Sequence, residues 1–201
     1  MHVYELDHPY GQYCLAQLRK RHLPIDEFRQ YGNILVTFLL TEATKNLQLK
    51  DENSRTFSID DDLPVFLPVL RAGLSLLDIA LKLFPKASVG ILGAERDEST
   101  AEASVYYKKF PTLEDKHVII LEPMLATGGT LSQVIQNILK DKPRAISIVS
   151  VIASLQGIQA LSAFDNISLQ VAAIDPSLDE RKYIVPGLGD FGDRWFGTNE
   201  I

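Results

Sequence analysis

The chain has 201 residues, of which 46% are hydrophobic and 23% are charged, and its formal net charge is −6. This is the composition of an ordinary globular protein with a large apolar core. The acidic balance speaks against a nucleic-acid surface, because phosphate backbones are bound by clustered lysines and arginines. The single cysteine, Cys14, excludes an internal disulfide and a cysteine-rich metal site.

The first residues do not have the character of a signal peptide, since His2, Glu5 and Asp7 lie among them. No apolar stretch approaches the roughly 20 residues that are needed to span a bilayer. We therefore expect a cytoplasmic protein that contacts neither a membrane nor a nucleic acid.

Helical patterns occupy the first 50 residues. A helix is expected over residues 13–21, with Cys14 as a small buried side chain. Pro24 and Asp26 then open a longer helix that extends to about residue 46, with Asp26 as its N-cap. Its apolar face is wider than a surface helix needs, which favours a core or subunit contact. The polar stretch 50–62 is expected to be an exposed connection.

Strands and helices alternate beyond this connection. Apolar runs predict core strands at residues 65–70, 88–92, 118–121, 145–153 and 169–174. Helical patterns follow several of them, at residues 74–84, 131–139 and 155–164. The alternation predicts an α/β fold with one doubly wound, five-stranded and mostly parallel sheet flanked by helices. We expect a single domain over residues 1–201.

The strand at residues 118–121 leads into an acid and a glycine-threonine loop. Glu122 follows the strand directly, and the loop ATGGT (residues 126–130) precedes the helix. Glycines let backbone N–H groups turn toward an anion, the threonine hydroxyls add donors, and a helix N-terminus is electropositive. No lysine follows the second glycine, so this is not the Walker phosphate loop. Taken alone, the stretch suits two interpretations about equally, a tight strand-to-helix turn and a phosphate site at the carboxyl edge of the sheet.

Three stretches together resemble the uracil phosphoribosyltransferase family of type I phosphoribosyltransferases. They are HVIILEPMLATGG (residues 117–129), LPVLRAGL (67–74) and YIVPGLGDFGDR (183–194). The resemblance extends from about residue 8 to about residue 198. It implies the type I phosphoribosyltransferase fold, with N-terminal helices (1–50), a flexible β-arm (94–110) and a base-binding hood (176–201).

The resemblance also implies a binding site for 5-phosphoribosyl 1-diphosphate (PRPP). Its catalytic residues would be Arg71 and Arg96 on the diphosphate, Glu122 on the ribose hydroxyls, and Asp190 on the donor through a water or a metal ion. The family has a cis peptide that does not precede proline in the loop 71–73. The implied PRPP-binding residues are Arg71, Ala72, Gly73, Arg96, Glu122, Pro123, Met124, Leu125, Ala126, Thr127, Gly128, Gly129, Thr130 and Asp190. The implied uracil-binding residues are Met124, Ile184, Gly189, Asp190 and Phe191.

The reaction implied by the resemblance joins uracil N1 to C1 of the ribose and releases diphosphate, giving UMP. Its oxocarbenium-like state requires positioning and charge neutralisation more than acid–base chemistry. Mg²⁺, held through PRPP and water, would neutralise the diphosphate. The family further implies a homodimer or higher homo-oligomer, and parts of it are activated by GTP.

Three residues depart from the family pattern. Glu122 replaces an aspartate, Glu95 stands where the arm carries an aromatic residue, and Phe191 replaces a small residue in the base loop. The longer acid shifts a carboxylate, Glu95 adds negative charge beside the donor, and Phe191 is expected to narrow or cover the base pocket. Two alternatives therefore stay open, a phosphoribosyltransferase for another base and a non-catalytic nucleotide-sensing relative. Binding of PRPP without turnover would distinguish the sensor.

Overall fold

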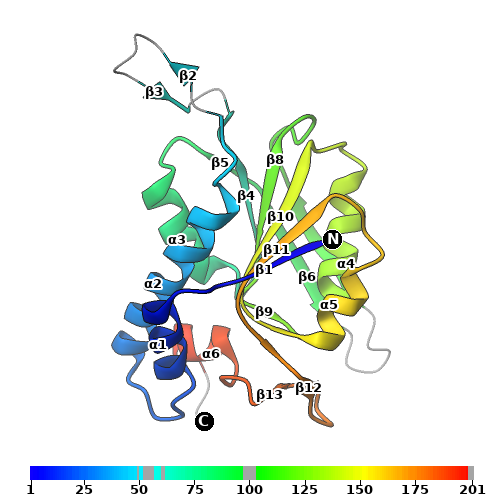
Figure 1. Ribbon diagram of the computed structural model, residues 1–201. Coiled ribbons are helices and arrows are strands. Elements are labelled where there is room, and N and C mark those ends of the chain that lie inside the picture. Colours follow the sequence, from blue (N-terminus) through cyan, green and yellow to red (C-terminus); the bar gives the residue numbers. More distant parts are fainter. Residues whose placement is uncertain (49, 52–56, 60–61, 97–102, 199–201) are drawn as a thin grey trace.

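The computed structural model describes residues 1–48, 50–51, 57–59, 62–96 and 103–198 (Figure 1). Its main sheet has the strand order β1-β11-β10-β8-β4-β6-β7, with β5 paired to β4 and β9 paired to β10. Every pairing in this sheet is parallel except that of β6 with β7. The predicted α/β fold with a mostly parallel sheet is therefore confirmed, although the described residues place nine strands in the sheet and not five.

All five predicted core strands form. They are β4 (Val65–Leu70), β8 (His117–Leu121), β10 (Ala145–Ser154), β11 (Ile167–Asp175) and, divided in two, β5 (Ser88–Val89) with β6 (Ile91–Arg96). The sheet also contains β1 (His2–Glu5), β7 (Ala103–Lys109) and β9 (Met124–Leu125). The edge strand β1 was not predicted, because its four residues are all exposed and carry no apolar alternation.

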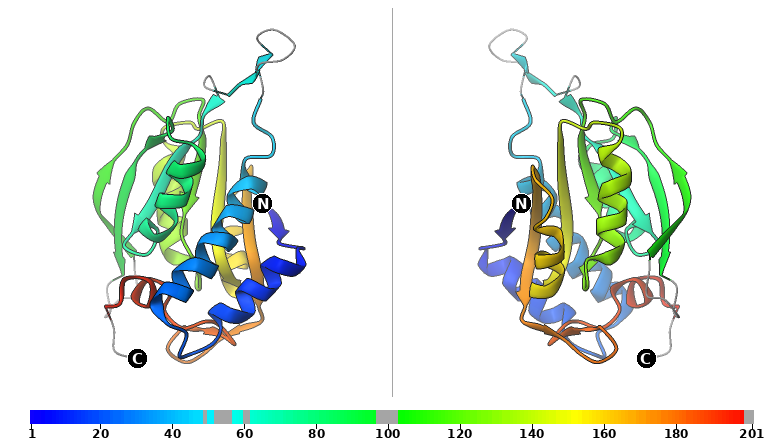
Figure 2. Two further views of the ribbon diagram at one scale, coloured as in Figure 1. Left: turned by 90° about the vertical axis from the view of Figure 1, so that its left-hand side faces the viewer. Right: turned by 90° about the vertical axis from the view of Figure 1, so that its right-hand side faces the viewer.

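Helices cover both faces of the sheet (Figure 2). One apolar cluster joins α1 (Pro9–Leu18), α2 (Ile25–Ala43) and α3 (Leu74–Leu83) to one face, and a second joins α4 (Gly129–Leu139) and α5 (Leu155–Leu161) to the other. Along β8, Ile119 belongs to the first cluster and its neighbour Ile120 to the second. Burial on both faces explains the continuous apolar runs from which the strands were predicted.

The N-terminal helices differ in detail from the sequence expectations. α1 begins at Pro9 and ends at Leu18, rather than spanning 13–21, and Cys14 is fully buried within it, as predicted. The N-cap of α2 is Pro24, so the prediction of Asp26 is wrong, and Asp26 lies in the first turn. There its carboxylate is close to the positive end of the helix dipole. No described helix is both long and apolar enough to cross a bilayer.

Two short hairpins lie at opposite ends of the sheet (Figure 1). The stretch expected to be a plain connection contains β2 (Lys50–Asp51) and β3 (Phe57–Ser58), which pair antiparallel and stand away from the sheet. At the other end, β12 (Ser177–Leu178) pairs with β13 (Ile184–Val185), and α6 (Phe191–Phe196) follows. The tail expected to be a packed loop thus includes a short helix.

The α6 helix is packed against α2 through aromatic rings. Trp195 stacks on Phe191 with ring centroids 5.6 Å apart and meets Phe28 edge-on at 6.5 Å. Gly32 of α2 makes room for this contact, because a Cβ atom there would lie 2.8 Å from the Trp195 ring. This packing fixes the C-terminal segment against the carboxyl end of the sheet.

Candidate active site

The loop after β4 passes very close to the end of β8. A Cβ atom on Gly73 would lie 2.2 Å from the Leu121 carbonyl oxygen and 2.6 Å from the Val69 nitrogen, so only glycine fits. The peptide bond between Leu70 and Arg71 is cis, as the family resemblance implies. The loop with Arg71, Ala72 and Gly73 is thereby placed beside Glu122, which follows β8.

The glycine-threonine loop (residues 126–130) is held by hydrogen bonds to the N-terminus of α5. The Ser154 hydroxyl donates to the Ala126 carbonyl at 2.6 Å and accepts from the Gly157 N–H at 2.9 Å. Gly128 has φ +80°, and a Cβ atom there would lie 2.8 Å from the Ala160 Cβ. Both the conformation and the available space therefore require glycine at the start of α4.

A cavity of about 190 Å³ opens above this loop. Its walls contain half of the residues that the family resemblance assigns to PRPP, and Arg71, Ala72, Gly73 and Asp190 are not among them. The lining residues are Glu122, Met124, Leu125, Ala126, Thr127, Gly128, Thr130, Leu131 and Lys182. The Gly129 N–H donates to the Thr127 hydroxyl at 3.5 Å, whereas the Pro123 carbonyl is bonded by β10 and does not line the cavity.

Lys182 is a cavity residue that the sequence analysis did not identify. It lies in the turn between β12 and β13. Its backbone has φ +68°, a conformation that residues other than glycine rarely adopt. Asp179 holds this turn by accepting the N–H groups of Arg181 at 2.9 Å and Tyr183 at 2.8 Å. A positive charge beside a phosphate loop is favourable for a phosphorylated ligand. Its position in the chain, far from the loop, carries no signal of this proximity.

Glu122 and Asp190 are close enough for their charges to interact. Burial raises the pKa of the half-buried Glu122 to about 8; the Met124 N–H, 3.5 Å from Oε1, lowers it, and the charge of Asp190 raises it. In the unliganded protein Glu122 therefore keeps its proton at neutral pH. Glu122 and Asp190, the two acids assigned from the family resemblance, are therefore neighbours whose charges affect each other.

This shift predicts a pH-dependent cost to stability. The unfolded chain releases the Glu122 proton near pH 4.5 while the folded chain holds it up to about pH 8, so folding stability falls as the pH rises through this interval. Glu122→Gln should remove the effect and raise the free energy of unfolding at alkaline pH by about 3 kcal/mol, since partial solvent contact reduces the full value of the shift. Urea unfolding at about pH 5 and about pH 9 measures the difference. Equal gains at both pH values would contradict it.

The hood faces the Arg71 loop directly. The Arg71 guanidinium lies 2.5 Å from Asp193 Oδ1, and 5.6 Å from the centroid of the Phe196 ring. A Cβ atom on Gly192 would lie 3.1 Å from the Ala72 Cβ. Asp190 caps α6 by accepting the Asp193 N–H at 2.8 Å. Asp193 was not among the predicted site residues, although it stands three residues after Asp190.

Phe191 does not narrow or cover the cavity, and this expectation is wrong. Its side chain is fully buried and packs against Phe28, at 5.0 Å between ring centroids, as well as against Trp195. The Phe191 N–H instead points to the cavity residue Met124, whose sulfur it meets at 3.2 Å. The large side chain belongs to the core, and only the backbone of this residue faces the site.

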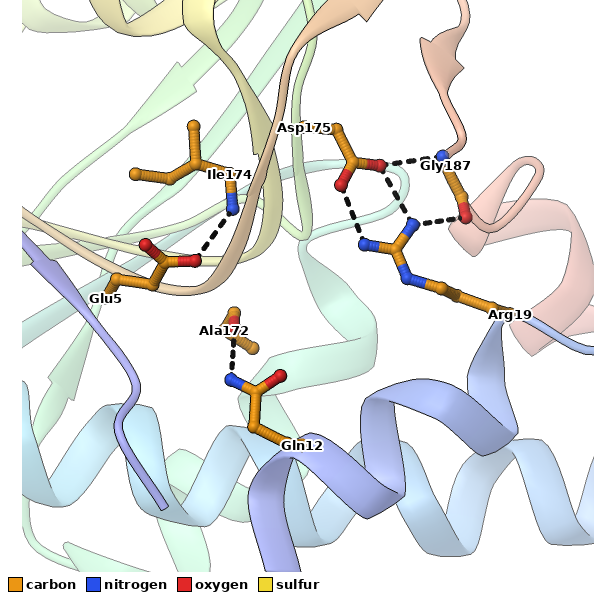
Figure 3. A network of polar contacts seen from close by, with 7 residues as sticks. All are labelled: Glu5, Gln12, Arg19, Ala172, Ile174, Asp175 and Gly187. Atoms are coloured by element: carbon orange, nitrogen blue, oxygen red, sulfur yellow. Dashed lines mark hydrogen bonds and ion pairs between the residues drawn. The ribbon is translucent and has the colours of Figure 1, made fainter. Parts of the chain in front are cut away.

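The base-loop segment around Gly187 is attached to the end of β11 by the network in Figure 3. The two Nη atoms of Arg19 donate to the Asp175 carboxylate at 2.7 and 2.8 Å, and Nη1 also donates to the Gly187 carbonyl at 2.8 Å. The Gly187 N–H completes the ring of contacts at 2.7 Å from Asp175. Burial raises the pKa of Asp175, but the bonds from Arg19 and Gly187 lower it by more, so it lies below its ordinary value.

The Arg19 network positions the segment that carries Ile184 and Gly189. Ile184 is buried in β13, and Gly189 has φ +80°. A Cβ atom on Gly187 would lie 2.0 Å from the Ile184 carbonyl, so this turn also requires glycine. Neither Arg19 nor Asp175 was identified from the sequence.

Arg96 is the last residue of β6, where its backbone pairs with that of Ala103. The arm residues 97–102 lie outside the described part of the chain. The expected roles of Arg96 and Glu95 therefore stay predictions.

Comparison with known proteins yields one consistent family. A sequence model of the uracil phosphoribosyltransferase family matches residues 5–198. The chain is 37% identical over 205 residues to uracil phosphoribosyltransferase of Aquifex aeolicus, covering 98% of this chain and 99% of the relative. It is 39% identical over 193 residues to that of Mycoplasma genitalium, covering 92% and 93% respectively.

Solved structures agree with this relationship. A protein of Aquifex aeolicus superposes with a TM-score of 0.91 at 36% identity, covering 99% of this chain and all of the other. A hypoxanthine phosphoribosyltransferase of Staphylococcus aureus has a TM-score of 0.55 at 16% identity, with 86% and 90% coverage. At that identity the second similarity shows the type I phosphoribosyltransferase fold alone.

Proposed function

Since the chain belongs to the uracil phosphoribosyltransferase family, we propose that it transfers the phosphoribosyl group of PRPP to uracil, giving UMP and diphosphate. The observation that carries this proposal is the convergence of three segments around one carboxyl edge of the sheet. The Arg71 loop, the Glu122 strand end with its phosphate loop, and the hood contact one another there.

Each segment suits one part of the donor. The loop at residues 126–130 and the start of α4 provide N–H groups and hydroxyls for the 5-phosphate. Glu122 would orient the ribose hydroxyls. Arg71, exposed at the mouth of the site, offers a fork of donors to the diphosphate, and we assign Arg96 the same role from the arm.

In this proposal, the uracil ring is bound by the hood and by Met124. Uracil presents alternating carbonyl and N–H groups, which backbone groups of Ile184, Gly189 and Phe191 can complement. The Phe191 N–H is held by a thioether sulfur, a weak acceptor that a uracil carbonyl would readily replace. Because the Phe191 ring is buried elsewhere, it leaves the space for a base open.

A magnesium ion fits this arrangement if PRPP supplies most of its ligands. The described residues contain no group of three or more metal-ligating side chains, but Asp190 lies close enough to Glu122 for its charge to raise the pKa of that acid. Mg²⁺ is usually held by one or two carboxylates together with substrate phosphates and water. Asp190 would hold the ion through water, and the ion would neutralise the departing diphosphate.

Lys182 is expected to contribute to donor binding. It is the basic residue in the lining of the phosphate-loop cavity, where a cation stabilises a bound phosphate. Lys182→Met should raise the KM for PRPP about tenfold with little change in kcat, because the contact would be present before and during the reaction. Steady-state kinetics with varied PRPP measures this effect. Arg181→Met, in the same exposed turn but not in the cavity lining, is the control, and an equal effect of both variants would contradict the assignment.

The function is tested by UMP formation from PRPP, Mg²⁺ and uracil, with cytosine and hypoxanthine as competing bases. Selective use of uracil supports the proposal. Transfer to another base would identify a relative of different specificity, and PRPP binding without transfer to any base would identify a nucleotide sensor. The buried Phe191 side chain favours the first outcome, since it removes one reason to doubt uracil binding.

The same proposal includes a homodimer or higher homo-oligomer, a cytoplasmic location and activation by GTP in this chain. Sedimentation of the purified protein tests its oligomeric state. Rates of UMP formation with and without GTP test the effector.

A further inference from the structure

A row of polar side chains crosses the sheet at the end opposite to the active site. His117 of β8 meets the Ser147 hydroxyl of β10 at 2.8 Å from Nε2. The Ser147 hydroxyl meets that of Ser168 in β11 at 2.9 Å, and Gln170 Nε2 donates to the Ser168 hydroxyl at 3.1 Å. These four residues, here called the polar row, belong to the amino-terminal halves of three adjacent parallel strands.

The polar row lies on a face of the sheet that is otherwise apolar. Two residues further along each strand, the same face carries Ile119, Val149 and Ala172 of the core. Ser147 and Gln170 are only 4% and 3% exposed. Sheets covered by helices on both faces normally bury aliphatic side chains, and burying a polar one costs free energy unless it is fully hydrogen-bonded. Packing alone therefore does not explain the row.

One atom in the row has no partner. Gln170 Oε1 is buried and accepts no hydrogen bond from any described residue. If the amide were turned over, its nitrogen would be left without an acceptor instead, so in either orientation one polar atom is free. A buried amide in this state lacks one of the hydrogen bonds that it could form.

The polar row forms part of the lining of a cavity of about 560 Å³, a volume typical of small-molecule sites. The cavity lies between the sheet, the segment after α2 and the edge strand β1. Besides the polar row, it is lined by Tyr4 and His2 of β1, by Asn46 and Leu47 after α2, and by the rim charges discussed next. Active-site residues are absent from its described lining.

Charges at the rim of the cavity are already compensated. Lys45 pairs with Glu42 and lies 4.3 Å above the Tyr4 ring, and Arg144 lies 2.5 Å from Asp62. Burial and the charge of Arg144 lower the pKa of His117, against an opposing effect of Asp62, so the imidazole is neutral at neutral pH. Apart from these charged residues and the neutral His117, the lining consists of uncharged polar and apolar residues. A ligand group entering it must exchange hydrogen bonds without bringing a charge.

From this geometry we propose that the cavity binds a small, neutral, planar molecule that carries an amide or lactam group. Such a group offers an N–H and a C=O side by side, which satisfies the free atom of Gln170 in either orientation of its amide. The serine hydroxyls and the His117 imidazole serve the remaining polar edge. The inference does not depend on the activity of the other site, which lies at the opposite ends of the strands.

The chain offers a local probe for this test, because only four histidines occur in it. His117 and His2 line the cavity, whereas His22 is exposed elsewhere. In ¹H NMR titrations with nicotinamide or uracil, we expect saturable shifts of the His117 and His2 ring resonances and none of His22. Nicotinate, which replaces the amide with a carboxylate, should bind at least about tenfold more weakly. Saturation by nicotinamide alone indicates an amide ligand, and saturation by uracil indicates a lactam.

Gln170→Met tests the role of the free amide, since it keeps the length of the side chain and removes its polar atoms. We expect an at least tenfold loss of probe affinity, about 1.4 kcal/mol, with UMP formation unchanged. Gln136→Met, on the exposed side of α4, is the matched control. The proposal is overturned if neither probe shifts the His117 resonance saturably, or if Gln170→Met and Gln136→Met bind the probe equally well. Ser168→Ala gives a second reading should Gln170→Met fail to fold.

Discussion

Arg71→Ala is expected to lower kcat/KM for PRPP by about two to three orders of magnitude. The departing diphosphate is the most highly charged group in the reaction, and a preorganised donor that meets developing charge contributes about 10²–10³-fold in rate. Arg71 stands at the mouth of the site, with a side chain that is 55% exposed. Its contact to Asp193 uses Nη2, which leaves the other guanidinium donors available to the diphosphate.

Stability should change little in this variant, since an exposed ion pair contributes about 0–1 kcal/mol. Kinetics with varied PRPP, together with thermal unfolding, therefore separates a catalytic loss from a folding loss. Lys82→Ala removes an exposed cation that is likewise 2.5 Å from an acid, Asp78 on α3, and is the control. An Arg71→Ala enzyme that keeps a tenth or more of its kcat/KM would contradict the role.

Asp193→Asn separates two readings of the Arg71 contact. If Asp193 only holds the guanidinium until PRPP arrives, the variant retains kcat and binds PRPP as well as the parent or better. If the contact positions Arg71 for the reaction, kcat falls. Measuring KM and kcat of the variant side by side distinguishes these outcomes.

Arg194→Met should lower the free energy of unfolding by about 3–5 kcal/mol, the effect expected when a buried, hydrogen-bonded charge is removed. Arg194 is buried, and Nη1 donates to the carbonyls of Leu18 at 2.6 Å and Leu188 at 2.5 Å. Nη2 donates to the Lys20 carbonyl at 2.7 Å, and the guanidinium lies 4.2 Å from the Phe28 ring centroid. Three carbonyl groups, from the end of α1, the loop after it and the hood, would lose this donor.

The methionine variant keeps the apolar stem, so the loss reports the hydrogen bonds and the contact of the cation with the ring. For a chain of this size the expected shift of Tm is about 10 °C. Arg29→Met is a matched control, because Arg29 also donates to a carbonyl of the hood, that of Trp195, but from an exposed position. Urea unfolding of both variants decides the matter, and similar losses would show that burial is not the cause.

Loss of the Arg194 hydrogen bonds to the hood should weaken uracil binding more than PRPP binding. Arg194 bonds Leu188, and Leu188 adjoins Gly189 in the proposed base loop. Under conditions where the Arg194→Met variant is still folded, we therefore expect the KM for uracil to rise more than the KM for PRPP.

Several elements could be predicted from the sequence because their causes are local. The strands β4, β8, β10 and β11 are buried on both faces, so each is predominantly apolar in sequence. The turn between β8 and α4 was also predicted from its glycines and threonines, although its role as a phosphate loop rests on the family resemblance and stays a prediction. Gly128 shows the reason directly, because its positive φ and its close neighbours both exclude a side chain.

Other features were decided by contacts between segments far apart in the chain. β1 exists only because β11 offers an edge to pair with, and Lys182 reaches the phosphate loop only because the hood folds back over it. From the sequence, the Phe191 side chain was expected to obstruct the base pocket. In the structure it points into the core, where it packs against Phe28 and Trp195.

The division follows from the range of the interactions involved. Backbone conformation and the periodicity of burial are set by neighbouring residues, and these identified the sheet, the phosphate loop and the family. The direction of a side chain depends on which distant surface can bury its apolar area or complete its hydrogen bonds. The contact of Arg71 with Asp193, the attachment of Gly187 through Arg19 and Asp175, and the polar row all arise in this way, and only the tertiary structure shows them.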